Sequence, residues 1–192
     1  MRDSLLFLKT FVQKPTQVGS IWPSSRGLSE MLVDSIDWGK AKCVVEFGPG
    51  TGVATEVIAK RLHSAVKFFA IERSGALAEK TRTRCPSVDV IEGCVTEVEN
   101  YCRQRSVAQV DGVISGLPWA AFTSELQNSI IEAMFRVLPI GGQFATFAYL
   151  QGLMLPAGKR FQSLLKQNFS SVTKSPVVWM NMPPAFVYRC VR

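Results

Sequence analysis

Three closely spaced glycines preceded by an acidic residue form the segment of this chain best suited to bind a small charged ligand. Residues 43–52 read CVVEFGPGTG, with Glu46 followed by Gly48, Gly50 and Gly52. The apolar residues before Glu46 predict a buried parallel strand, and glycines let the backbone of a turn approach a ligand closely. We therefore predict a strand that runs into a binding turn, with a helix after the turn.

The spacing of the glycines and the charge beside them restrict the ligand. A dinucleotide-binding turn has the pattern GxGxxG, in which backbone amides face a pyrophosphate. This turn has the pattern GxGxG, and the carboxylate of Glu46 would repel a pyrophosphate but attract a cation in a partly dry cleft. S-adenosylmethionine, which carries a sulfonium and an ammonium group, is a ligand of the required charge.

A second acidic residue, Glu72, ends an apolar segment over residues 65–72, and it follows Gly52 by 20 residues. In sheets built from alternating strands and helices, a carboxylate at this distance from the glycine turn binds the hydroxyl groups of a ribose. Glu46 and Glu72 together therefore predict a site for a ligand that contains both a cationic group and a nucleoside.

Helix and strand patterns alternate along the chain. We expect helices over residues 27–35, 53–62, 75–84, 97–105, 124–138 (with Ser124 as the N-cap) and 156–168. We expect strands from residue 43 and over residues 65–72, 88–91, 110–115, 143–149, 171–180 and 185–191, the last two joined by residues 182–184. This order predicts an α/β fold, a three-layer αβα sandwich around a mostly parallel seven-stranded sheet that an antiparallel hairpin closes.

Length and composition predict a single domain over residues 1–192. The chain is 47% hydrophobic, which suits one core, and residues 1–36 would form a helical cap before the first strand. No apolar segment approaches the ~20 residues of a membrane span or the core of a signal peptide, so we expect a cytoplasmic protein. Five cysteines without a CxxC pair and a single histidine argue against a metal site.

The net charge of +7 is concentrated in the C-terminal third of the chain. Residues 133–192 contain seven Lys and Arg residues and no acidic residue, whereas basic and acidic residues balance over residues 1–132. A basic surface favours a partner that carries phosphate groups, either a lipid or a nucleic acid, although a merely solubilising surface has the same composition.

The segment from Glu46 to Gly52 resembles the cofactor-binding turn of Rossmann-like (class I) methyltransferases, whose pattern is E/D-x-G-x-G-x-G. The resemblance implies a Rossmann-like fold and S-adenosyl-L-methionine as the cofactor. It implies cofactor contacts at the following positions: Glu46, Gly48, Gly50, Thr51, Gly52, Glu72, Cys94, Val95 and Ser115. Cys94 departs from the Asp, Asn or Ser common in the class. Because a thiol is a weak hydrogen-bond partner, the adenine would depend more on apolar and backbone contacts.

Three further segments narrow the resemblance to one family. Residues 18–28 (VGSIWPSSRGL), 115–119 (SGLPW) and 183–185 (PPA) resemble bacterial phospholipid N-methyltransferases, which carry G-x-I-x-P-S-S, S-G-L-P and P-P-A at these places. This resemblance covers nearly the whole chain. It implies that the chain methylates the amine of phosphatidylethanolamine and of its partly methylated forms, toward phosphatidylcholine, at a membrane surface.

Other functions remain open from the sequence. Ribosomal RNA adenine N6-dimethyltransferases share the core but use an N-L-P-Y loop and add a C-terminal helical domain. Here Ser115 replaces the Asn, and the chain ends after the last predicted strand, so we expect nucleic acid not to be the acceptor. A small-molecule methyltransferase, or a binding module of the same fold without catalytic activity, is a further alternative.

The resemblance also indicates residues for the acceptor. Leu117, Pro118 and Trp119 follow the fourth strand, where the loop would face the transferable methyl group. The Trp119 ring could hold an ammonium by cation–π attraction. Arg26 is expected to bind a lipid phosphate, because a guanidinium matches phosphate oxygens in bidentate fashion.

Transfer of a methyl group to an amine requires the removal of a proton. Such an amine has a pKa near 10 and arrives protonated. We expect Tyr149, at the end of the fifth strand, or water reached through the Ser115 loop to accept this proton, which makes Tyr149 and Ser115 the predicted catalytic residues.

Two segments predict contact with an anionic membrane surface. Drawn as a helix, residues 2–14 place apolar side chains on one arc and cations beside it, the pattern of an interfacial helix, although a helix that covers the core has the same pattern. Residues 150–160, LQGLMLPAGKR, combine apolar side chains with Lys159 and Arg160. We therefore expect peripheral association with the inner face of the membrane.

Overall fold

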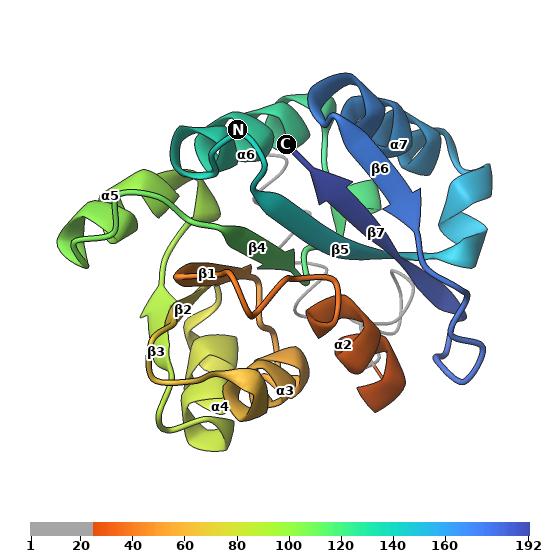
Figure 1. Cartoon of the computed structure of the whole chain (residues 1–192). Helices are drawn as coiled ribbons and strands as arrows, with labels where there is room; N and C mark the ends of the chain where they lie inside the picture. The colour runs from red at the N-terminus through yellow and green to blue at the C-terminus, as the bar shows by residue number, and fades with distance from the viewer. Residues whose placement is uncertain (1–24) are drawn as a thin grey trace.

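A computed structural model describes residues 25–192 of the chain (Figure 1). The predicted helix over residues 2–14, most of the predicted cap over residues 1–36, and the part of the G-x-I-x-P-S-S segment before Ser25 lie outside the described residues. Over residues 25–192, no helix has the length and apolar character that crossing a membrane requires.

The described residues form one sheet of seven strands. These are β1 (Cys43–Phe47), β2 (Lys67–Glu72), β3 (Asp89–Glu92), β4 (Gly112–Ser115), β5 (Gln143–Tyr149), β6 (Ser171–Lys174) and β7 (Ala185–Val191). Their order across the sheet is β3-β2-β1-β4-β5-β7-β6. Strands β1 to β5 run parallel, and β7 pairs antiparallel with both β5 and β6. The predicted sheet, mostly parallel and closed by an antiparallel hairpin, is confirmed.

Helices cover both faces of this sheet (Figure 1). One face carries α2 (Arg26–Val33), α3 (Val53–Arg61) and α4 (Gly75–Arg84), and the other carries α5 (Val98–Gln104), α6 (Ser124–Val137) and α7 (Pro156–Asn168). Short 3-10 helices, η1 (Val95–Glu97), η2 (Trp119–Ala121) and η3 (Leu150–Met154), lie in the connections. Because side chains alternate along a strand, Val45 packs with α5 to α7 while its neighbour Val44 packs with α2 and α3. The three-layer αβα sandwich is confirmed.

Strand β6 is shorter than predicted. It ends at Lys174, whereas the prediction extended it to Met180. The Ser175 N–H group still donates to the Val187 carbonyl, but Pro176 has no N–H group with which to continue the ladder. The loop between β6 and β7 therefore covers residues 175–184.

The predicted N-cap of α6 is also displaced by one residue. Ser124 is the first residue of the helix, and Thr123 is the N-cap, whose side chain accepts a hydrogen bond from the Leu126 N–H group. Both residue types cap helices well, so the sequence alone does not choose between two neighbouring hydroxyl residues.

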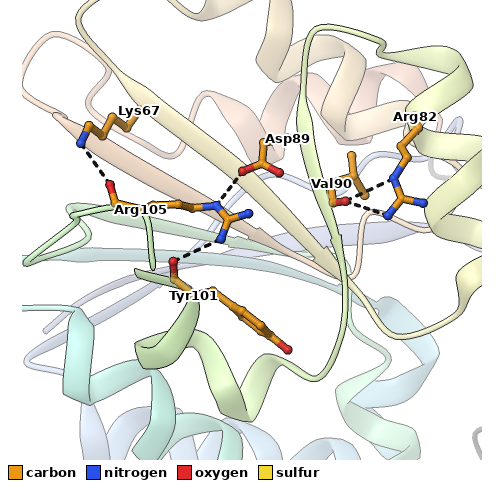
Figure 2. A network of polar contacts seen from close by, with 6 residues as sticks. All are labelled: Lys67, Arg82, Asp89, Val90, Tyr101 and Arg105. Atoms are coloured by element: carbon orange, nitrogen blue, oxygen red, sulfur yellow. Dashed lines mark hydrogen bonds and ion pairs between the residues drawn. The ribbon is translucent and has the colours of Figure 1, made fainter. Parts of the chain in front are cut away.

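A polar network fixes the edge of the sheet at which β2 and β3 begin (Figure 2). The Arg105 Nε atom lies 2.6 Å from Asp89 Oδ2, and its Nη1 atom donates to the Tyr101 carbonyl at 3.3 Å. The guanidinium carbon lies 5.1 Å from the centre of the Phe69 ring, and the Arg105 carbonyl accepts a hydrogen bond from Lys67 Nζ at 3.3 Å. Arg105 thus joins the end of α5 to the starts of both strands.

We expect Arg105→Met, which keeps an apolar stem and removes the guanidinium, to lower the free energy of unfolding by about 1–2 kcal/mol, as chemical denaturation would measure. Cofactor affinity should not change, because the network lies at the sheet edge away from the glycine turn. Arg103→Met is the matched control. The Arg103 side chain is 71% exposed in the same helix, so its loss should change stability by less than about 0.5 kcal/mol. Equal losses in the two variants would contradict this role of Arg105.

Candidate active site

Glycines with positive φ angles build the turn between β1 and α3. Gly48 has a φ of +68° and Gly50 a φ of +62°. A Cβ atom at Gly48 would lie 2.7 Å from the Leu117 Cδ2 atom, so the loop after β4 closes off this position. A Cβ atom at Gly50 would meet no atom within 4 Å, so this position faces open space that a ligand can approach. Thr51 and Gly52 complete the turn, and Gly52 is the N-cap of α3.

The turn after β1 and the loop after β4 meet through backbone atoms. A Cβ atom at Gly116 would clash with the Gly48 carbonyl oxygen. The Gly116 N–H group donates to the Phe47 carbonyl at 2.8 Å, and the Gly48 N–H group donates to the Ile71 carbonyl at 2.9 Å. These bonds extend the strand ladders into the connections, and so they hold three neighbouring strand ends in fixed positions.

Glu72, the last residue of β2, holds the glycine turn in place. Its Oε2 atom accepts a hydrogen bond from the Gly50 N–H group at 3.0 Å, and its Oε1 atom accepts one from the Ser74 N–H group at 2.9 Å. Burial raises the pKa of this carboxyl, and the backbone N–H groups offset part of that rise. The residue predicted to bind ribose therefore lies at the turn, where its carboxylate also sets the shape of the turn.

Glu46 lies beneath the turn and is almost fully buried. The residue is 1% exposed, and the Thr55 hydroxyl of α3 donates to its Oε2 atom at 2.7 Å. Burial raises the pKa of Glu46 to about 8. The ion pairs formed among residues 25–192 do not include this carboxyl. A cation bound at the turn would therefore stabilise the ionised form of Glu46.

The segment after β3 lies next to the end of β2. The Gly93 N–H group donates to the Glu72 carbonyl at 2.8 Å, which brings Cys94 close to the glycine turn. The Cys94 Sγ atom lies 3.0 Å from the Thr96 hydroxyl oxygen, and Val95 begins η1. The residues predicted to contact the cofactor, apart from Ser115, thus come together at neighbouring strand ends.

Two residues on this side were not predicted from the sequence. Glu92, the last residue of β3, packs over Gly75, where a Cβ atom would lie 2.8 Å from the Glu92 Oε1 atom. The Tyr101 ring covers Gly93, where a Cβ atom would clash with it. In both cases a glycine beside a strand end is the available signal, because it lets another side chain approach the backbone.

Trp119, predicted to contact the substrate, belongs to the core. It is 2% exposed, and its ring stacks on Phe161 with 4.8 Å between the ring centres. Its Nε1–H group donates to the Ser115 hydroxyl at 3.0 Å, and the Gln127 Nε2 atom donates to the Trp119 carbonyl at 2.7 Å. Core side chains cover this ring, which does not favour its contact with an ammonium, and that contact stays a prediction.

Ser115 shapes the loop after β4. The residue is 0% exposed, and its Oγ atom accepts hydrogen bonds from both the Trp119 Nε1–H group and the Leu117 N–H group. Its carbonyl accepts a further bond from the Thr146 hydroxyl at 3.1 Å. Because its hydroxyl and its carbonyl are both engaged by neighbouring groups, Ser115 is suited to position the loop, and its catalytic and cofactor contacts stay predictions.

Tyr149 lies on the opposite face of the sheet from Ser115. Ser115 pairs with Thr146 across β4 and β5, and Tyr149 follows Thr146 by three residues, which turns its side chain toward the layer that contains α2. Burial raises the pKa of the Tyr149 phenol, so the phenol is protonated at neutral pH. The two predicted catalytic residues therefore do not come together, and the role of Tyr149 as proton acceptor stays a prediction that its raised pKa does not favour.

The remaining predicted substrate residues keep some surface exposure. The Arg26 side chain is 76% exposed at the start of α2, and its Nε atom lies 3.0 Å from Glu30 Oε1. Leu117 and Pro118 are half-buried, and Pro118 is the N-cap of η2. Over residues 25–192, no cluster of His, Cys, Asp and Glu side chains is arranged to hold a metal ion.

The fold is that of solved methyltransferase structures. An O-methyltransferase from Bacillus cereus in complex with SAH has a TM-score of 0.69 and 13% identity, with 100% of this chain and 91% of that chain covered. The O-methyltransferase TomG from Streptomyces achromogenes, in complex with SAM, has a TM-score of 0.68 and 15% identity, with 100% and 90% covered. These neighbours show that the chain has the Rossmann-like fold of class I methyltransferases.

The sequence narrows this class to one family. No family model matches the chain. An ornithine lipid N-methyltransferase from Singulisphaera acidiphila is 35% identical over 195 residues, which cover 99% of this chain and 96% of that protein. The chain belongs to this family of lipid N-methyltransferases, and the resemblance found in the sequence is confirmed.

We expect Ser115→Ala to lower the free energy of unfolding by about 1–3 kcal/mol, because it leaves the buried Trp119 N–H group without an acceptor. It should also lower kcat/KM for the acceptor while cofactor affinity stays the same, since the loop after β4 loses two hydrogen bonds and the glycine turn loses none. Denaturation, steady-state kinetics and calorimetry measure the three quantities.

Ser124→Ala is the control, because Ser124 is exposed and does not cap α6. A loss of cofactor affinity equal to the loss in kcat/KM would refute the assignment.

We expect Glu46→Gln to remove a pH dependence that the buried carboxyl creates. The pKa of Glu46 in the folded chain, about 8, exceeds its ordinary 4.5. The contribution of this carboxyl to the free energy of unfolding is therefore greatest below pH 4.5 and is lost as the pH rises through 8. The Gln variant should therefore gain Tm relative to the parent chain as the pH rises. Cofactor affinity of the parent chain should increase up to about pH 8, with proton release below it, because a cationic ligand favours the carboxylate.

Thermal unfolding across pH and calorimetry in buffers of different ionisation enthalpy measure these effects. Glu56→Gln is the matched control. Glu56 is an exposed carboxylate in the next helix, and its partner Lys60 lowers its pKa, so this variant should keep the parent pH profile between pH 6 and 9. Parallel profiles for the parent chain and Glu46→Gln would contradict the expectation.

Proposed function

We propose that the chain methylates the amine of a membrane lipid, with phosphatidylethanolamine and its partly methylated forms as acceptors. The observation that carries this proposal is the 35% identity, over 99% of the chain, to a lipid N-methyltransferase. The segments that resemble G-x-I-x-P-S-S, S-G-L-P and P-P-A support a phospholipid acceptor. Ornithine lipid, which the name of the relative specifies, is the second candidate, because its head group also presents an amine.

Three strand ends supply residues suited to hold the cofactor. When bound, S-adenosylmethionine supplies an electrophilic methyl group next to a positively charged sulfur. Gly50 faces open space, Glu72 lies beside it with a buried carboxyl, and Glu46 would supply a second negative charge once a cation is bound. Cys94 and Val95, after β3, would contact the adenine through apolar and backbone groups. This donor set suits a cationic nucleoside ligand and agrees with the cofactor of the class.

The loop after β4 is the natural place for the acceptor amine. Leu117 contacts the glycine turn, and Ser115, Trp119 and Gln127 hold the loop in one shape from below. The amine lone pair would form a bond to the methyl carbon in line with the carbon–sulfur bond that breaks. Orientation of the two reactants by such a rigid loop can account for a large part of the rate enhancement.

Water is the proposed acceptor of the amine proton. The amine has a pKa near 10, so it must lose its proton before its lone pair can attack. Tyr149 is protonated at neutral pH because burial raises its pKa, and Ser115 is fully buried. No step then requires an ionised side chain to take the proton, and water at the open side of the loop fulfils this role.

A lipid acceptor requires binding to a membrane surface. Lys159, Arg160 and Lys166 are exposed on α7, within a C-terminal third that has no acidic residue. These cations support our proposal that a single-domain cytoplasmic enzyme associates peripherally with an anionic membrane, at its inner face. The predicted helix over residues 2–14, which lies outside the described residues, would add to this binding.

Methyl transfer from labelled S-adenosylmethionine to vesicles tests the function directly. We expect labelled product with phosphatidylethanolamine vesicles, and thin-layer separation would distinguish the mono-, di- and trimethylated lipids. Parallel reactions contain ornithine lipid vesicles, RNA, or a metabolite extract. Label in ornithine lipid alone would select the second candidate. Label in RNA or metabolites without label in either lipid would overturn the proposal, and failure to bind the cofactor would indicate a non-catalytic module.

A matched pair of glycine variants serves as the internal control. Gly50→Ala should lower cofactor affinity at least about tenfold, because a side chain at positive φ strains the turn and projects into the space the ligand would enter. Gly141→Ala carries the same kind of strain, with φ +84° and no atom within 4 Å, in the turn before β5 at the opposite edge of the sheet. It should keep full methyl transfer.

A further inference from the structure

Exposed apolar side chains gather at one edge of the molecule. Among the described residues, six large hydrophobic side chains are strongly exposed, and five of them are Met154, Leu155, Trp179, Met180 and Met182, each at least 54% exposed. We call these five residues the apolar rim. Met154 is the last residue of η3, Leu155 connects η3 to α7, and the other three belong to the loop between β6 and β7.

The two parts of the apolar rim are neighbours although they are distant in sequence. Tyr149, the last residue of β5, pairs with Ala185, the first residue of β7, and the Leu150 N–H group donates to the Pro184 carbonyl at 2.8 Å. Both parts follow the edge at which the parallel strands end, which is also the edge of the glycine turn and of the loop after β4 (Figure 1). The apolar rim therefore lies at the same edge of the sheet as the candidate active site.

The loop between β6 and β7 presents these side chains in an ordered way. Asn181, between Met180 and Met182, is only 3% exposed, and its Oδ1 atom accepts a hydrogen bond from the Ser25 N–H group at 2.8 Å. Its Nδ2 atom donates to the Pro183 carbonyl at 2.6 Å. The polar residue is thus anchored inside while the apolar residues on either side point outward, the reverse of the usual arrangement in water.

The charges around the apolar rim match an anionic surface. Lys159 and Arg160 are exposed in the first turns of α7, directly after Leu155, and the loop over residues 175–184 contains no acidic residue. Arg26, 76% exposed, begins α2 next to Val178, which lies 3.9 Å from a Cβ atom placed at Gly27. Apolar side chains flanked by cations enter the interface of anionic bilayers.

We propose that the apolar rim inserts into the surface of an anionic phospholipid bilayer and holds the mouth of the active site against it. This inference rests on the proposed function, because a lipid acceptor explains why the surface lies at the same edge as the site. It adds the loop between β6 and β7 to the membrane contacts predicted for residues 2–14 and 150–160.

Vesicle binding by the full chain tests the proposal. The triple variant Trp179→Ser, Met180→Ser, Met182→Ser should bind vesicles of phosphatidylcholine with phosphatidylglycerol at least about tenfold more weakly in a sedimentation assay. Ile140→Ser is the matched control, because Ile140 is 90% exposed in the turn before β5, at the opposite edge, and its loss should leave binding unchanged. Equal binding by the triple variant and the parent chain would overturn the proposal.

A second measurement reports the insertion itself. Brominated phospholipids in the vesicles should quench the tryptophan fluorescence of the parent chain, and this quenching should fall markedly in Trp179→Phe, which keeps the apolar character. Acrylamide in the absence of vesicles should quench the parent chain more than Trp179→Phe. If Trp179 is already shielded without vesicles, another part of the chain or a second copy covers the apolar rim, and the proposal fails.

Methyl transfer separates this inference from the proposed function. The triple variant should lose transfer to phosphatidylethanolamine vesicles but keep parent rates with a short-chain phosphatidylethanolamine below its critical micelle concentration. Equal loss with both substrates would show that the loop serves the reaction and would overturn the membrane role. If the parent chain methylates neither lipid, the proposed function fails. Vesicle binding and fluorescence quenching then still test whether the apolar rim inserts into the bilayer.

Discussion

The backbone contact between Gly48 and Gly116 is the constraint on which the site depends. The turn after β1 and the loop after β4 approach so closely that a Cβ atom at Gly116 would clash with the Gly48 carbonyl oxygen. In the proposed reaction, the turn after β1 forms the cofactor side and the loop after β4 forms the acceptor side. Because the two meet through main-chain atoms, their relative position does not depend on a flexible side chain, and the reacting groups can be held at a fixed separation.

Each of these connections has its own support. On the cofactor side, the Glu72 carboxylate binds the N–H groups of Gly50 and Ser74, so a buried charge orders two turns at once. On the acceptor side, hydrogen bonds from Trp119 to Ser115 and from Gln127 to Trp119 tie the loop to the core under α6. Hydrogen bonds inside the protein therefore hold the two connections rigidly. The variable features of this edge of the sheet are the side chains on its outer surface.

Sequence patterns predict the bounds of a helix or strand well where residues at both of its ends indicate a boundary. The helix at 75–84 and that at 156–168 have the predicted bounds, as do the strands at 143–149 and 185–191. Proline is favoured at the first position of a helix, and Pro156 holds that position in α7. The turn at residues 139–142 separates α6 from the strand after it. The placement of the glycines and acids at one edge of the sheet was also predictable, because these residues follow strand ends in sequence order.

Contacts between distant residues were not predictable. An aromatic residue in a loop suggests a binding surface, but the stacking of Trp119 on Phe161 depends on the docking of α7, 42 residues further along. The separation of Tyr149 from Ser115 depends on the register between β4 and β5. Likewise, Asn181 would be placed in solvent by its polarity, and only the approach of the α2 N-terminus explains its burial.

Glu46 has a consequence for the end of the reaction cycle. Transfer of the methyl group would convert the sulfonium into a neutral thioether and leave the ammonium, so the spent cofactor would carry one positive charge fewer for a buried carboxylate to attract. The Glu46 carboxylate, for which the Thr55 hydroxyl is the side-chain donor among residues 25–192, would then have less counter-charge near it and would favour protonation more. A group that strengthens binding of the fresh cofactor would thereby weaken binding of the product, which would reduce product inhibition and speed the exchange of one cofactor molecule for the next.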